Sequence, residues 1–185
     1  MTRFTRLCRA VGVGLAVAAA TLSMTQVAHA ALPSPTVPDV KLEVPAGNEA
    51  FLVGHVSTGV QIYKCDGSAW SFVAPRADLV DDTGQLIIKH FAGPTWQEAP
   101  DGSSVVATRV YGVTVDKTAI PWLKLEATKT TAGRGGNLLA PTTFIQRINT
   151  VGGLAPTEPC NAGRSGTVKE VPYGADYFFY KSTKG

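Results

Sequence analysis

The stretch "QLIIKHFAGPTWQEAPDGSSVVATRVYG", residues 85–112, contains two apolar runs separated by turn-forming residues. In the first run, alternation places Leu86, Ile88 and His90 on one face of an extended chain. The second run also alternates and is rich in β-branched side chains, as is typical of strands. A Gly-Pro pair and an Asp-Gly pair between the runs reverse the chain direction. This stretch therefore predicts two β-strands joined by a loop.

The same pattern recurs along the rest of the chain, with turn signals every eight to twelve residues. The other candidate strands are residues 50–57, 59–65, 70–74, 119–130, 138–150 and 175–181. No convincing helical period is found outside the first thirty residues. This spacing predicts one all-β domain over residues 48–185, built as an antiparallel sandwich or a small barrel.

For two of these strands, the sequence also predicts where they lie in the sheet. Pro121 has no N–H to donate, so its strand either lies at a sheet edge or begins at the proline. The last strand, "ADYFFYK" at 175–181, is aromatic on both faces. We expect it to be covered on both sides, between two layers or deep in a barrel wall.

The first thirty residues resemble a secretory signal. Three arginines precede a short apolar run at 11–22, and Ala28-His29-Ala30 forms a small-x-small site, which predicts cleavage after Ala30. The mature protein is expected to be extracellular or periplasmic, and no later segment is long and apolar enough to cross a membrane. Residues 31–47 contain four prolines and predict an extended lead-in rather than a packed element.

The charge balance narrows the class of partner. Of the 17 Lys and Arg, three Arg lie in the leader, which leaves 14 basic and 14 acidic side chains in the mature chain. A net charge near zero with no basic cluster argues against nucleic-acid binding and against an electrostatic membrane patch.

Two cysteines remain after the leader, Cys65 and Cys160. In an oxidising compartment they most simply form one disulfide, with two unpaired buried thiols as the alternative. A bridge across 95 positions stabilises the fold by about 4–5 kcal/mol in the loop-entropy treatment. No C-x-x-C spacing exists to suggest a redox or zinc site.

Five blocks in fixed order resemble a family of exported bacterial and fungal proteins, domain-of-unknown-function family 3455. The blocks are "GVQIYKCDGSAW", "GPTWQEAPDGSSV", "AIPWLKL", "IQRINTVGGLAPTEPC" and "VPYGADYFFY". The resemblance covers about residues 50–180. It implies a secreted single domain with two matched cysteines, here Cys65 and Cys160, and it brings no established catalytic residues.

The loop at 90–104 has a catalytic and a structural interpretation. In the first, His90 is a general base or metal ligand, Asp101 its carboxylate partner and Trp96 a stacking platform. In the second, which we favour, His90 is buried and hydrogen-bonded, and Trp96 closes one end of the core. The sequence makes His90 and Asp101 weak catalytic candidates.

Other catalytic chemistry has little support in the sequence. A metal site made from His55, His90 and a carboxylate is conceivable, but there is no H-E-x-x-H motif and no G-x-S-x-G motif. Cleavage after Ala28 would create an amino-terminal histidine, as in the copper site of lytic polysaccharide oxidases. Small residues are favoured where Gln26 would then lie, so cleavage after Ala30 is preferred. We predict no metal and no cofactor.

A binding surface is the preferred functional hypothesis. Trp96, Trp122 and Tyr63 offer flat rings that can stack on sugars or line an apolar pocket, and Arg147 offers a polar lining. The expected function is binding of a carbohydrate or a small apolar molecule, or a structural role in the cell envelope. The alternative is an extracellular hydrolase or metal-dependent oxidase that uses His90 with a nearby carboxylate.

Overall fold

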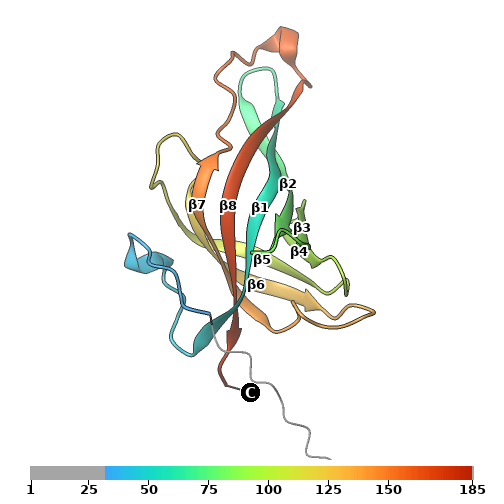
Figure 1. Ribbon diagram of the computed structural model, residues 1–185. Coiled ribbons are helices and arrows are strands. Elements are labelled where there is room, and N and C mark those ends of the chain that lie inside the picture. The colour runs from blue at the N-terminus through green and yellow to red at the C-terminus, as the bar shows by residue number, and fades with distance from the viewer. Residues whose placement is uncertain (1–31, 185) are drawn as a thin grey trace, which may run out of the picture.

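The computed structural model describes residues 32–184, and the predicted leader lies outside this range. Eight strands and two short 3₁₀ helices follow in the order β1 (Asn48–Cys65), β2 (Trp70–Val80), β3 (Leu86–Phe91), β4 (Thr95–Glu98), β5 (Ser104–Val113), β6 (Trp122–Thr131), β7 (Thr142–Gly152) and β8 (Val168–Ser182), with η1 (Val40–Leu42) before β1 and η2 (Ala162–Arg164) before β8 (Figure 1). Within residues 32–184, no helix is long and apolar enough to cross a membrane.

The strands form a closed antiparallel barrel. Each strand pairs with the next along the chain, and β8 pairs with β1 to close the sheet. The prediction of an all-β antiparallel domain is confirmed, and of its two architectures the barrel is the observed one. A closed sheet has no edge strands. Pro121 therefore immediately precedes a strand, and β6 begins at Trp122.

Because consecutive strands are antiparallel, their connections divide between two ends of the barrel. The hairpin end carries the β1–β2, β3–β4, β5–β6 and β7–β8 connections. The terminal end carries the other three connections and both ends of the described chain (Figure 1). The β1–β2 hairpin and the segment before β8 extend beyond the hairpin end.

The terminal half of the barrel is filled mainly by apolar side chains, with Glu98 as a buried polar one. Leu79, Ile88, Val105 and Phe179 point inward from four strands and are fully buried. Leu139, from the β6–β7 connection, is also fully buried in the same cluster. Burying one such side chain stabilises the fold by roughly 1.5–3 kcal/mol, so this half supplies much of the stability.

The two strands predicted at 50–57 and 59–65 are one strand, β1, with an irregularity between them. Its register with β2 shifts between Val56 and Thr58. A Cβ on Gly59 would lie 2.6 Å from Val56 and 2.9 Å from Tyr173. The glycine thus permits a close approach of β8 to β1. The break that the sequence predicts between residues 57 and 59 is a bulge within one strand.

The lead-in at 31–47 is more closely packed than the sequence predicts. Within its described part, Leu42 is fully buried, and the Leu42 carbonyl accepts a 2.7 Å hydrogen bond from Gln146 Nε2 on β7. The Tyr111 hydroxyl donates to Asp39 at 2.6 Å. Prolines remove N–H donors but leave carbonyl acceptors and apolar surface, so a proline-rich segment can still cover a sheet.

This covering segment explains the two aromatic faces of β8. Tyr177 and Phe179 point into the barrel and are buried there. Tyr180 points outward yet is also buried, and its hydroxyl donates to Gln146 Oε1 beneath the lead-in. The prediction that the last strand is covered on both sides is confirmed.

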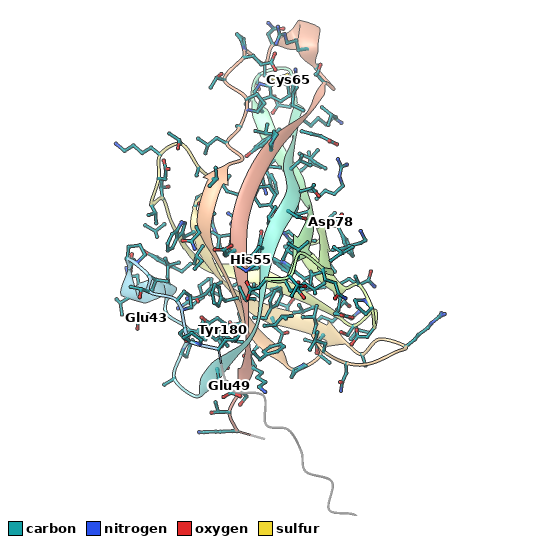
Figure 2. The ribbon with its side chains drawn as sticks, in the orientation of Figure 1. Glu43, Glu49, His55, Cys65, Asp78 and Tyr180 are labelled. Atoms are coloured by element: carbon teal, nitrogen blue, oxygen red, sulfur yellow. A yellow bond between two sulfur atoms is a disulfide. The ribbon has the colours of Figure 1, made fainter. Side chains whose placement is uncertain are left out.

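Cys65 and Cys160 form the predicted disulfide, with Cα atoms 5.5 Å apart (Figure 2). The bridge ties the end of β1 to the β7–β8 connection. Trp70 Nε1 donates to the Glu158 carbonyl at 2.9 Å beside it. The extended β1–β2 hairpin is thus anchored by the disulfide and by several hydrogen bonds, including the one from the Cys65 N–H to the Thr167 carbonyl.

Candidate ligand site at the hairpin end of the barrel

A cavity of about 180 Å³ lies inside the hairpin half of the barrel. Every strand contributes to its lining, in chain order through Gln61, Pro75, His90, Trp96, Arg109, Leu123, Arg147 and Tyr177. Directly paired residues of antiparallel strands project to the same side of the sheet. The register pairs Gln61 with Pro75, Leu123 with Arg147, and Arg147 with Tyr177, which places all of them on the interior face.

Three packed aromatic rings lie between this cavity and the apolar core. The rings of His90 and Trp96 are nearly parallel, with centroids 4.1 Å apart and an interplanar angle of 9°. Tyr177 meets both edge-on, and Phe179 meets Trp96 edge-on from the terminal half. His90 is 4% exposed and Trp96 is 1% exposed. These rings form a rigid floor for the cavity.

His90 is neutral and has a defined tautomer. Its Nδ1 lies 2.9 Å from the Thr95 carbonyl oxygen, which can only accept, so Nδ1 carries the proton. Burial lowers the pKa of His90 to about 3, and the charge of Arg147 acts in the same direction. Nε2 therefore has a free lone pair, and His90 is a weak base near neutral pH.

Two arginines give the cavity a positive charge. Arg147 is fixed because its Nε and one terminal nitrogen donate to the Pro121 carbonyl at 3.2 and 2.9 Å. Arg109 is exposed at the cavity rim, on the same face of the sheet as its paired residue Leu125. Within residues 32–184, neither arginine forms an ion pair with a carboxylate.

Two residues that line this cavity carry a buried donor without an acceptor. Trp96 Nε1 and Gln61 Nε2 have no hydrogen-bond partner among the described residues. Gln61 is only 3% exposed. An unsatisfied buried donor costs roughly 1–3 kcal/mol, so native structures seldom retain one without a reason.

Comparison with known families gives a match over residues 45–181 to the family described as protein of unknown function, DUF3455. The chain belongs to this family. Neither the curated proteins nor the solved structures include a significant match to this DUF3455 chain. The family assignment confirms the resemblance found in the sequence, and the function has to be argued from the site.

The DUF3455 fold brings together three of the residues singled out in the sequence. His90, Trp96 and Arg147, from three different strands, all line the cavity. Tyr63 is buried nearby, but its hydroxyl donates to the Gly153 carbonyl at 2.8 Å and does not line the cavity. Trp122 is half-buried at the start of β6 and also lies outside the lining.

Asp101 lies far from His90 in this DUF3455 domain. It occupies the β4–β5 connection at the terminal end, where its carboxylate accepts a 2.9 Å hydrogen bond from the Leu138 N–H. Burial raises the pKa of Asp101, but hydrogen bonds from Leu138 and Ser103 outweigh this effect and lower it to about 2. Within residues 32–184 no hydrogen bond joins Asp101 to His90, and the four residues of β4 lie between them.

His55 and His90 are not brought to one metal site either. His55 lies on β1 (Figure 2). Its Nδ1 is 2.7 Å from Asp176 and its Nε2 is 3.1 Å from Asp82. The hydrogen bond to Asp176 raises the pKa of His55. Both of its ring nitrogens are thus occupied by carboxylates. No group of three metal-ligating side chains occurs among residues 32–184.

Sequence reasoning missed Gln61 and Arg109 as lining residues. Val105, Ala107 and Arg109 follow one another at every second position of β5, and the first two are buried. An arginine that continues the buried face of a strand is the signal that could have identified the site. Gln61 precedes the buried Tyr63 in the same way on β1.

Proposed function

We propose that this DUF3455 domain is an exported binding protein that holds a small molecule in the cavity at the hairpin end. The observation that carries the proposal is the pair of unpartnered donors, Trp96 Nε1 and Gln61 Nε2, beside the lined cavity. Small barrels can hold one compact ligand in their interior. A ligand oxygen that accepts from these donors would recover the cost of leaving them unsatisfied.

The nature of the cavity favours a compact ligand over a sugar polymer. The ring of Trp96 is buried beneath the cavity instead of lying on an open face where a chain of sugars could stack. Catalysis is less well supported than binding, because His90 is a weak base with no carboxylate partner among its hydrogen bonds. Export is supported by the Cys65–Cys160 bridge, since disulfides persist in oxidising compartments.

The proposal is tested by nuclear magnetic resonance on the mature protein with a panel of one-ring compounds that are neutral, cationic or anionic. We expect at least one compound to shift the Trp96 indole N–H resonance in a saturable way. Leu123→Trp, which fills the cavity from its lining, should abolish this shift. Val110→Trp is the matched control, because Val110 is an exposed β5 residue outside the lining.

The proposal fails if no compound moves the Trp96 resonance. It also fails if a compound moves this resonance equally in the wild-type protein and in Leu123→Trp, since binding would then lie outside the cavity.

A further inference from the structure

We propose that the ligand is a small aromatic carboxylate, whose carboxylate is bound by Arg109 and Arg147 and whose ring rests on the His90–Trp96 floor. This inference rests on the proposed binding function and specifies its ligand. It follows from the charge of the cavity, from the balance of donors and acceptors in its lining, and from its size.

The charge of the cavity is uncompensated. Arg109 and Arg147 line it, while no aspartate or glutamate does. Five other basic residues form ion pairs with acidic partners elsewhere in the described chain, namely Arg76, Lys89, Arg164, Lys169 and Lys181. Two arginines that line one cavity without a carboxylate favour an anionic ligand, because the ligand then supplies the missing negative charge.

The lining also offers more donors than acceptors. Trp96 Nε1 and Gln61 Nε2 are unpartnered donors, and Arg147 uses only its Nε and one terminal nitrogen on Pro121. The side-chain acceptors among these residues are the lone pair of His90 Nε2, left by its tautomer, and the amide oxygen of Gln61. A carboxylate has two oxygens that accept several hydrogen bonds each, so it matches this excess of donors.

The fixed position of Arg147 favours binding further. The Pro121 carbonyl holds this guanidinium in place before any ligand arrives, so little side-chain entropy is lost on binding. Arg109 is exposed and has no charged partner in the described structure, so its guanidinium is free to close over the carboxylate. A planar guanidinium fits a planar carboxylate better than a point charge does.

The apolar part of the lining argues for a ring in place of an inorganic anion. Phe72, Val73, Pro75, Leu123 and Leu125 supply apolar surface, and the floor is aromatic. A strongly hydrated phosphate or sulfate would gain nothing from these contacts. The cavity volume of about 180 Å³ exceeds that of the roughly 150 Å³ cavity known to hold benzene, which leaves room for a carboxyl group.

Isothermal titration calorimetry with benzoate, benzamide and inorganic phosphate tests the inference. Benzamide has nearly the shape of benzoate without its charge. We expect benzoate to bind at least tenfold more tightly than benzamide, and phosphate to bind more weakly than benzoate. Arg109→Gln and Arg147→Gln should each weaken benzoate binding about tenfold. Arg134→Gln is the matched control, because Arg134 is exposed at the terminal end, and it should leave the affinity unchanged.

The outcomes separate the two proposals. Equal affinity for benzoate and benzamide would overturn the carboxylate assignment while supporting a binding function. Phosphate that binds as tightly as benzoate would overturn the aromatic assignment. Loss of affinity in Arg134→Gln equal to that in Arg109→Gln would show that the arginines act through overall charge, which also contradicts the inference. If none of the compounds on the wider one-ring panel binds, the proposed function itself fails.

Discussion

The two halves of the barrel interior share one strand alternation but carry different side chains. In the terminal half, the inward positions hold Leu79, Ile88 and Phe179, all fully buried. In the hairpin half, the inward positions of the same sheet hold Gln61, His90 and Arg147 around a cavity.

This difference separates the apolar packing that stabilises the fold from the proposed ligand site. Apolar side chains packed without a cavity stabilise the fold, whereas polar side chains inside a barrel cost free energy unless they are hydrogen-bonded. The closed terminal half can support a hairpin half that retains two unsatisfied donors. We therefore expect substitutions in the terminal half mainly to lower stability and substitutions in the hairpin half mainly to weaken ligand binding.

The largest expected effect is on stability and lies in the terminal half. Leu79→Ala removes a fully buried side chain and should lower the free energy of unfolding by about 2–5 kcal/mol. Leu123→Ala removes the same atoms from the half-buried lining of the cavity, so its loss should be clearly smaller. Urea unfolding of both variants measures the contrast. Equal losses would remove the distinction between the two halves.

The next effect is a pH dependence that originates in the hairpin half. The folded-state pKa of His90 is lowered to about 3, whereas an unfolded histidine titrates near pH 6.5. The unfolded chain therefore binds more protons between these values, and stability should fall as the pH falls through this window. His90→Phe keeps a ring on Trp96 and should make this decline shallower, as measured by urea unfolding at several pH values.

His55 provides a control of opposite sign for that measurement. The hydrogen bond to Asp176 raises the folded-state pKa of His55. The contribution of His55 to the free energy of unfolding is therefore fully present below the unfolded pKa and is lost as the pH rises through the folded pKa. His55→Gln should therefore flatten the pH dependence on the alkaline side only. If His90→Phe also changed only that side, our assignment of a neutral buried His90 would be wrong.

The smallest expected effect on stability distinguishes a binding site from a poorly packed core. Gln61→Leu removes an unpartnered buried amide of similar size and should raise the free energy of unfolding by about 1 kcal/mol. The same change should weaken benzoate binding several-fold, because a donor is lost. Thermal unfolding and calorimetry check the two parts. A variant that is less stable but binds equally well would show that Gln61 supports the core.

Much of the fold could be predicted from the sequence because buried side chains recur at every second residue along the strands. That period identified the segments of β3, β5 and β8, and Pro121 marked the start of β6. Barrel closure could not be predicted, since it depends on pairing between β1 and β8, whose partners such as Asn48 and Ser182 are 134 positions apart. The four-residue β4 is too short to show a period, so the sequence predicts one loop over residues 90–104, where the structure has β4.

The site could be predicted only in part. Trp96, His90 and Arg147 stood out by residue type, and the structure brings them together. Asp101 stood out equally, but strand β4 carries it to the other end of the barrel. Gln61 and Arg109 were missed because an isolated polar residue in an alternating strand is usually assigned to the solvent face. Their alternation with buried neighbours hints at an inward position, and the register of the paired strands shows it.

A crystal structure of the mature protein with benzoate tests the central claim most directly. We predict that the carboxylate lies within hydrogen-bond distance of Arg147 and Trp96 Nε1, with the ring over the His90–Trp96 stack at the hairpin end. A cavity that stays free of benzoate at saturating concentration, or benzoate bound only on the outer face of the barrel, would contradict it.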